Sequence, residues 1–400
     1  MKTLLKKLES WIVALFRVWR REFYVVFHDA GALLFFFALP LLYPLVYTLI
    51  YNPEIVEEIP FVVVDDSRTP ESRELVRMID ATQSMKSMGY ATSLEEARRW
   101  HAEKACYGIM VIPEDYATKI ARGEQAVVPF YSDMSLLIRY REFLTTLTNI
   151  QLATGAQIRQ EKIDVAGLAS GSLPTSAVGS QSTFLGNTQQ GFASFVMPGI
   201  LILILQQSLM LGVTMLCGTA RERRRRNHGH DLVAVKAPPT ATLMGKALCY
   251  VTIYLPLIIY VLHIVPWIFD LPMAEHPIDA VLFILPLLFA SVFMGMTIQG
   301  FVKERETSML IIVFSSVVFL FLSGLTWPRY AIDYPWSIFS QLVPATWGIE
   351  GFVRINTNGA TLAQNATPYQ MLWALTAVYF MTSLLACYAQ HRFFKKKRIK

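Results

Sequence analysis

The densest group of potentially reactive side chains follows the second long apolar run. An arginine run, Arg223 to Arg226, is followed by His228, His230 and Asp231. Imidazole and carboxylate groups are common metal ligands, but the neighbouring arginines would repel a divalent cation, and no further ligand lies nearby. The sequence therefore predicts no metal site here, and it leaves the arginines available for contacts with anionic lipid.

The sequence lacks the usual motif for binding ATP. The phosphate-binding pattern G-x-x-x-x-G-K-[ST] needs glycine where Thr240 stands and Ser or Thr where Ala247 stands, although Gly245 and Lys246 fit. Neither a Ser-His-Asp arrangement nor a carboxylate pair can be argued between residues 52 and 191, where acidic residues are interleaved with arginines as on a solvated face. We predict that the chain is not itself an enzyme and has no cofactor of its own, so any ATP-driven process that involves it would need a separate subunit to bind ATP and Mg.

Gln206 and Gln207 are the clearest polar feature inside an apolar run. Burying an amide without a partner costs on the order of 1 to 3 kcal/mol. One interpretation is a hydrogen bond between helices, worth roughly 0.6 to 2 kcal/mol in a membrane. The other is a polar spot in a substrate cavity, and the sequence leaves both open.

The composition indicates a membrane protein. The chain has 400 residues, of which 54% are hydrophobic and 16% charged, whereas a soluble domain of this size usually carries about 25% charged residues. The net charge of +6 could suggest nucleic acid, but the basic residues flank the apolar runs, as expected for cytoplasmic loops. We therefore exclude nucleic acid as a partner.

Six runs without Asp, Glu, Lys or Arg are long enough to cross the roughly 30 Å hydrocarbon layer. They predict a membrane all-α fold with six transmembrane helices and one inserted extracytoplasmic α/β domain. The predicted spans are residues 30–51, 192–217, 247–269, 280–302, 307–326 and 369–390.

Basic flanks predict the orientation of these spans. The first 29 residues, the loop 218–246 and the tail 391–400 are rich in Lys and Arg, which places them and both termini in the cytoplasm. Residues 1–29 also carry aromatic and basic side chains on different sides, as an amphipathic helix in the membrane interface would. The alternative is a plain cytoplasmic extension of the first span.

The insertion at 52–191 has an excess of acidic residues and is predicted to lie outside the membrane. Apolar segments at 61–65, 107–113 and 126–132 predict strands, and Thr69 and Ser93 stand where helix N-caps are expected. A helical pattern then extends from 135 to 164. The Gly- and Ser-rich stretch that follows predicts a flexible loop or an extended element near the membrane surface.

Residues 327–368 are too apolar for a solvated loop. Three prolines divide them into pieces too short to cross a bilayer, so we expect two short re-entrant helices in the outer leaflet. The residues expected to form this re-entrant gate are Pro328, Pro335, Trp336, Pro344 and Trp347.

Four segments carry a family resemblance over nearly the whole chain. They are RREFYVVFHDAGALLFFFALPLLYPLVY, VVVDDSRTPESRELVRMID, RERRRRNHGHDLVAVKAPPTATLMGK and LSGLTWPRYAIDYPWSIFSQLVPATWGIEGFVRI. In this order they resemble the ABC-2 permeases, also described as type V exporter-like, that have a large extracytoplasmic domain between spans one and two. The last segment, with Ser323, Gly324 and its three prolines, is the most specific.

The resemblance implies a half-transporter that forms a homodimer or heterodimer on two separate ABC ATPase subunits. It also implies that the loop after span two docks into the ATPase, although residues 224–231 depart from the sequence that relatives usually have there. The implied coupling residues are Arg221, Glu222, Arg223, Arg224, Arg225, Arg226, His230 and Asp231.

The expected function is ATP-driven export of an amphipathic, lipid-like or drug-like substrate across a bacterial cytoplasmic (inner) membrane. The expected cavity lies at the dimer interface between spans two and five and is lined by Gln206, Gln207, Met210 and Phe314. Membrane lipids and a periplasmic adaptor are further expected partners. An alternative is a non-transporting scaffold that engages an extracytoplasmic partner. An ion-coupled carrier is disfavoured because only His263 could titrate within a span.

Overall fold

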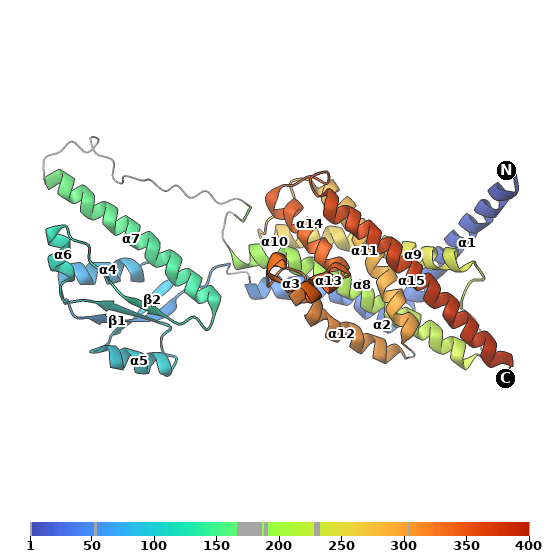
Figure 1. The fold of residues 1–400 in the computed structure, drawn as a ribbon, viewed down its shortest axis with the longest axis horizontal. Coiled ribbons are helices and arrows are strands. Elements are labelled where there is room, and N and C mark those ends of the chain that lie inside the picture. Colours follow the sequence, from blue (N-terminus) through green and yellow to red (C-terminus); the bar gives the residue numbers. More distant parts are fainter. Residues whose placement is uncertain are drawn as a thin grey trace. The chain divides into compact units, whose positions relative to one another are not determined.

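The computed structural model describes residues 2–51, 54–165, 186–187, 191–227, 233–302 and 304–399. The chain divides into two compact units (Figure 1). One unit comprises Met1–Asn52 with Phe184–Lys400, and the other comprises Pro53–Thr183. We call them the helical unit and the α/β unit.

The α/β unit contains one four-stranded sheet in the order β2-β1-β3-β4. β1 pairs in parallel with β2 and β3, whereas β4 is antiparallel to β3. The strands are β1 (Ile59–Asp65), β2 (Met85–Tyr90), β3 (Gly108–Ile112) and β4 (Phe130–Ser132). β2 was not expected from the sequence, because MKSMGY mixes polar residues with glycine and has little apolar content.

Helices cover both faces of this sheet. Phe61, Val63 and Met110 pack with residues of α4, α6 and α7, while Val62 and Ile109 pack with residues of α5 on the opposite face. This alternation follows from the period of two along a strand. The helices are α4 (Pro70–Asp80), α5 (Leu94–Ala102), α6 (Tyr116–Arg122) and α7 (Leu137–Val165).

Both expected N-caps are present in the α/β unit. The Thr69 side chain accepts from the backbone N–H of Ser72, and the Ser72 hydroxyl accepts from the N–H of Thr69. Ser93 caps α5 by accepting from Glu96 N–H. The carboxylate of Glu96 turns to Thr92 instead of completing a capping box with Ser93. The predicted flexible loop after α7 lies almost entirely outside the described residues.

Five helices in the described part of the helical unit are long and apolar enough to cross a membrane. They are Ala30–Tyr51, Phe192–Arg226, Pro239–Ile268, Pro277–Phe301 and Ala366–Gln390. The first consists of α2 (Ala30–Leu33), a π-helical turn (Leu34–Ala38) and α3 (Leu39–Tyr51), and the third of α9 (Pro239–Ile259), a π-helical turn (Tyr260–Ile264) and α10 (Val265–Ile268). The second, fourth and fifth are α8, α11 and part of α15 (Ala366–Ile399).

The fifth expected span is shorter than its predicted range of 307–326. Helix α12 (Arg305–Leu322) ends four residues early, and its apolar part is Met309–Leu322. Gly324 follows with a φ of +89°, a left-handed conformation that favours glycine. The chain therefore turns at this point and does not extend the helix to 326.

Both ends of the predicted cytoplasmic segment 218–246 are helical in the structure. Helix α8 continues without a break through Arg226, and α9 already begins at Pro239. No proline interrupts residues 218–226, and Ala, Arg and Glu are good helix formers, so the apolar run ends before the helix does. The arginine run therefore lies on the last turns of α8. Its positive charge interacts favourably there with the negative end of the helix dipole.

Helix α1 (Lys2–Phe27) is separate from the first apolar helix. The chain turns at His28, and the Asp29 carboxylate caps α2 by accepting from Gly31 and Ala32 N–H. α1 therefore does not continue straight into the first apolar helix. One of its sides packs on the core through Val26 and Trp19, while apolar residues such as Leu8 and Phe16 remain exposed.

The segment expected to be re-entrant contains two short helices, α13 (Tyr334–Gln341) and α14 (Pro344–Asn358). Pro335 stands in the first turn of α13 and Pro344 opens α14, where a missing N–H costs no hydrogen bond. A single 3₁₀ turn (Arg329–Ala331) precedes them.

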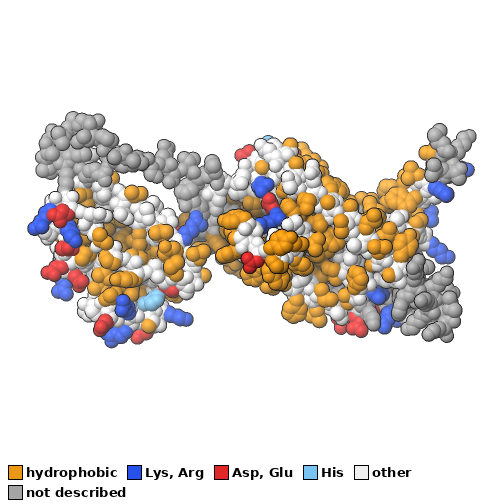
Figure 2. All heavy atoms as spheres, in the orientation of Figure 1, with side chains coloured by type: hydrophobic (Ala, Val, Ile, Leu, Met, Phe, Trp, Pro, Cys, Tyr) orange, Lys and Arg blue, Asp and Glu red, His pale blue; other side chains and the backbone are white. Residues whose placement is uncertain are grey.

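Helix α8 lies at the centre of the helical unit. In its most apolar stretch 83% of residues are buried, compared with 22% in Ala30–Tyr51 and in Ala366–Gln390. Hydrophobic side chains cover much of the face of this unit seen in Figure 2, as expected for a surface in contact with lipid. α8 is the protein-enclosed element, and the least buried helices are those available to lipid or a second copy.

Candidate functional site

The structure places Arg221 against the end of a neighbouring helix. Its guanidinium donates to the carbonyl oxygens of Gln299 and Gly300 at 3.2 and 3.3 Å, and also to that of Val302. These carbonyls belong to the C-terminal end of α11, where backbone acceptors lack helical partners and a cation is favourable. Arg221 therefore binds α8 to α11.

The remainder of the arginine run changes exposure along the helix. Arg223 and Arg224 are half-buried, whereas Arg225 and Arg226 are exposed at the end of α8. The two exposed guanidinium groups are the described residues of the run best placed to meet another molecule. His230 and Asp231, expected to take part in coupling, lie outside the described residues.

A buried charge cluster between α1 and α9 was missed by sequence reasoning. Glu22 of α1 is 5% exposed, and its Oε1 accepts from Lys246 Nζ at 2.9 Å and from Tyr250 Oη at 2.5 Å. In the sequence, Glu22 appears as one acidic residue in a basic segment. Only the spacing of Lys246 and Tyr250, four residues apart on one helical face, could have suggested a shared partner.

The polar pair in α8 has no hydrogen-bond partner among the residues that the structure describes. The side chain of Gln206 is fully buried, and both of its amide atoms, like those of the partly buried Gln207, are unpaired. Met210 is also fully buried, whereas Phe314 on α12 is 74% exposed. Phe314 therefore does not share the buried environment of the other three expected cavity residues.

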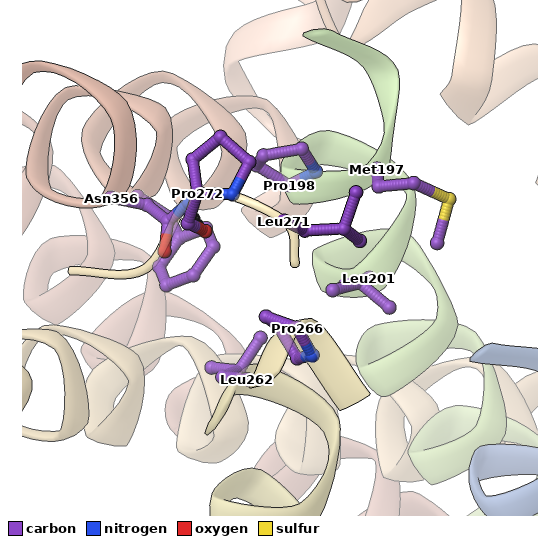
Figure 3. A pocket seen from close by; sticks show the side chains of 9 residues that line it. Met197, Pro198, Leu201, Leu262, Pro266, Leu271, Pro272 and Asn356 are labelled. Atoms are coloured by element: carbon purple, nitrogen blue, oxygen red, sulfur yellow. Dashed lines mark hydrogen bonds between the residues drawn. The ribbon is translucent and has the colours of Figure 1, made fainter. Parts of the chain in front are cut away.

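A small apolar pocket lies near the first turns of α8 (Figure 3). Its cavity volume is about 10 Å³, about the space that one water molecule needs. It is too small to hold a lipid. Its lining residues are Met197, Pro198, Leu201, Leu262, Pro266, Leu271, Pro272, Phe352 and Asn356.

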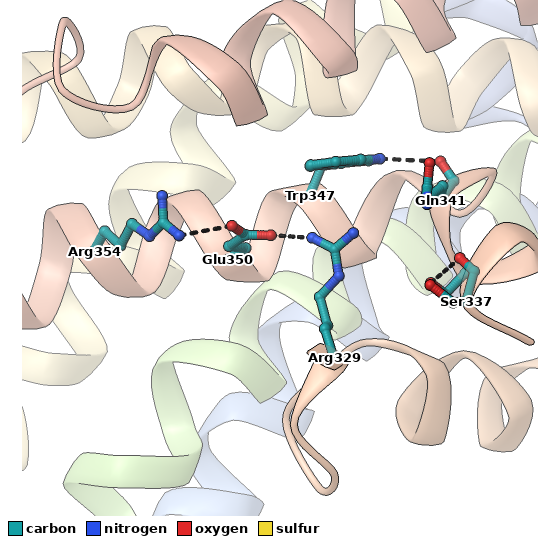
Figure 4. Close-up of polar contacts among 7 residues, drawn as sticks. Arg329, Ser337, Gln341, Trp347, Glu350 and Arg354 are labelled. Carbon is teal, nitrogen blue, oxygen red and sulfur yellow. Dashed lines mark hydrogen bonds and ion pairs between the residues drawn. The ribbon is translucent and has the colours of Figure 1, made fainter. Parts of the chain in front are cut away.

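A second charge cluster lies beside Trp347, one of the expected gate residues (Figure 4). Glu350 of α14 pairs with Arg329 and, at 2.7 Å, with Arg354. Arg329 also lies over the ring of Trp347, 4.3 Å from its centre, in cation–π geometry. These contacts fasten the 3₁₀ turn to α14.

The two expected gate tryptophans differ in hydrogen bonding and in exposure. Trp347 donates from Nε1 to the carbonyl of Gln341 at 3.0 Å and is 9% exposed, whereas Trp336 is 58% exposed. Pro328, Pro335 and Pro344 define the turns between these elements. The arrangement can hold a short hairpin in shape, and it contains no group placed for covalent chemistry.

The part of the chain that the structure describes contains no group of three His, Cys, Asp or Glu side chains that could hold a metal ion.

No curated protein matches this chain significantly. A family model described as "ABC-2 family transporter protein" matches residues 31–385. This range includes three of the five long apolar helices in full, most of the first and last ones, the α/β unit and the hairpin of α13 and α14. The family implies a multi-pass membrane protein that works with a partner ATP-binding subunit. The chain therefore belongs to the ABC-2 family of transporter proteins.

Proposed function

We propose that this chain is the permease subunit of an ATP-driven exporter of amphipathic, lipid-like or drug-like molecules in a bacterial cytoplasmic membrane. The observation that carries the proposal is family membership in a sequence that has no phosphate-binding loop. Because the chain cannot hold ATP in that way, the energy must come from a separate ABC ATPase.

The cytoplasmic end of α8 is the proposed docking surface for this ATPase. Arg225 and Arg226 are exposed at its tip, and Arg221 connects the same helix to the end of α11. A force on the tip would therefore reach two membrane helices at once. Both termini and the segment between α8 and α9 lie in the cytoplasm in this proposal, because they carry the basic flanks.

The substrate path in this proposal runs between two copies of the chain. The 22% buried share of the most apolar stretches of the first and last apolar helices supports a large exposed apolar surface, while the pocket near the first turns of α8 is small. A cavity between copies accounts for both. The α/β unit and the hairpin of α13 and α14 are proposed to lie on the outer side and to receive the substrate.

The test is reconstitution of the chain with its ATPase in lipid vesicles. Substrate-stimulated ATP hydrolysis, with outward movement of a fluorescent lipid or dye, is the expected result. Arg225→Glu with Arg226→Glu should reduce ATPase binding, and Arg98→Glu with Arg99→Glu on the α/β unit is the matched control. ATPase binding without stimulation by any lipid or drug would favour the non-transporting scaffold, and undiminished binding of the Arg225/Arg226 variant would contradict the docking surface.

A further inference from the structure

Helices α1 and α9 meet along a polar and close-packed seam. At one end Trp11 Nε1 donates to Thr240 Oγ1 at 3.0 Å, and further along Trp19 Nε1 donates to Thr252 Oγ1 at 3.4 Å. Between them the backbones approach so closely that a Cβ on Gly245 would lie 2.8 Å from the carbonyl oxygen of Leu15. The seam therefore extends over several turns of both helices.

The buried cluster of Glu22, Lys246 and Tyr250 lies within this seam. Lys246 and Glu22 retain only 20% and 6% of their side-chain exposure. Charges removed from water in this way are stable only as a pair, because either one alone would keep the desolvation cost without the attraction. The pair therefore resists any sliding of α1 along α9.

The seam also reaches the segment that connects α8 to α9. Arg21, next to Glu22, donates from Nε to the carbonyl of Val233 at 3.4 Å. Val233 lies between the arginine run and Pro239, where α9 begins. A displacement of this segment would therefore act on α1 and α9 together.

We propose that Glu22 is a positioning residue of the transport cycle, which holds α1 and α9 together as one rigid body through Lys246 and Tyr250. Movement imposed by the ATPase on the segment after α8 is then transmitted to both helices. If the pair is broken, α1 lags behind α9 and ATP hydrolysis is poorly coupled to transport. This inference rests on the proposed function and adds a residue that passes on the motion.

The first experiment measures the seam without using transport. Spin labels at the exposed positions Leu8 and Ile259, after replacement of the native cysteines by alanine, report the distance between α1 and α9 in the complex with the ATPase. In the parent protein we expect one narrow distribution, the same without nucleotide and with trapped ATP. Glu22→Gln should broaden it without nucleotide and broaden or shift it further with trapped ATP, whereas Glu9→Gln, an exposed carboxylate on the same helix, should change neither.

The second experiment measures coupling in vesicles that contain a fluorescently labelled phosphatidylethanolamine as the probe. Glu22→Gln should raise the ATP hydrolysed per labelled lipid moved by about fivefold or more, the usual lower range of coupling between sites. The exchange of charges, Glu22→Lys with Lys246→Glu, should recover most of the coupling. A purely structural role would give equal losses of hydrolysis and transport.

Tyr250→Phe is a second variant that tests the same cluster if Glu22→Gln fails to fold. It removes one donor while both charges stay, and it should produce a smaller change in the same direction. The inference is overturned if well-folded Glu22→Gln and Tyr250→Phe proteins keep the narrow distance and the parent coupling ratio. A parent protein without ATP-driven activity would overturn the proposed function instead, while the distance between labels in the nucleotide-free state would still show whether Glu22 fixes the seam.

Discussion

Two carboxylates in the helical unit have the same number of partners in different surroundings. Glu22 is shared by Lys246 and Tyr250, and Glu350 is shared by Arg329 and Arg354. The side chain of Glu22 is 6% exposed and that of Glu350 is 25% exposed. The two carboxylates therefore have the same number of partners, and they differ in how deeply they are buried.

Burial decides how strongly each cluster resists change. In a low-dielectric interior a charge that loses its partner keeps its desolvation penalty, whereas water replaces part of a lost contact at a half-exposed site. The cluster of Glu22 suits a permanent joint between α1 and α9. The cluster of Glu350 suits a fastening that can open and close in the hairpin of α13 and α14.

The largest effect should follow from removing the buried cation. Lys246→Met leaves the Glu22 carboxylate buried with Tyr250 alone, and we expect a loss of about 3–5 kcal/mol in the free energy of unfolding. Thermal unfolding of the purified protein in detergent measures it. Lys236→Met, an exposed lysine in the segment before α9, is the control, and an equal effect of both variants would remove the distinction based on burial.

An intermediate effect should follow from Glu350→Gln, because water can reach both arginines. We expect a loss of about 1–2 kcal/mol, between the values for exposed and buried pairs. Replacing each arginine by lysine sharpens this test. Arg329→Lys should cost more than Arg354→Lys, because Arg329 also lies over Trp347. The same unfolding assay ranks the variants, and the reverse order would contradict the role of that ring.

A buried polar group without partners should behave in the opposite way. Gln206→Leu replaces two unpaired amide atoms by apolar groups of similar size, so we expect a gain of about 1 kcal/mol in stability. Gln207→Leu, which is less buried, should gain less. If the amide of Gln206 contacts substrate, transport falls while the unfolding temperature rises. A large loss of stability would show that Gln206 does have a hydrogen-bond partner.

The smallest effect concerns a carboxylate at the surface of the α/β unit. Hydrogen bonds from the hydroxyl and backbone N–H of Thr92 hold the pKa of Glu96 below its usual range. A lowered pKa stabilises the fold above the unfolded value of about 4.3, and this contribution disappears as the pH falls through the lowered value. The protection factors of the α5 amides, which are exchange rates relative to those of the unfolded chain at the same pH, should therefore fall in acid. Glu96→Gln should weaken this dependence and Glu95→Gln should not.

The sequence predicted the elements that depend on local pattern. The apolar run FVVVD became the centre of β1, and Thr69 capped α4 as its position before proline indicated. Strand β2 could not be found in the same way, because its polar residues are held by pairing with β1, a contact distant in the sequence. Hydropathy predicted a membrane span that ends at 217, whereas α8 ends at Arg226, because hydropathy reports where a helix leaves the membrane and not where it stops.

For the candidate sites too, some features were determined by local sequence and others only by tertiary packing. The absence of a phosphate-binding loop and the positions of the three hairpin prolines are determined by the sequence alone, because motif and proline geometry act over a few residues. Only the tertiary structure showed that Arg221 caps α11, that Phe314 is exposed while Gln206 is buried, and that Glu22 meets Lys246. Those contacts join residues separated by up to 224 positions, and helix packing, which has no local signature, decides which of many charged residues become partners.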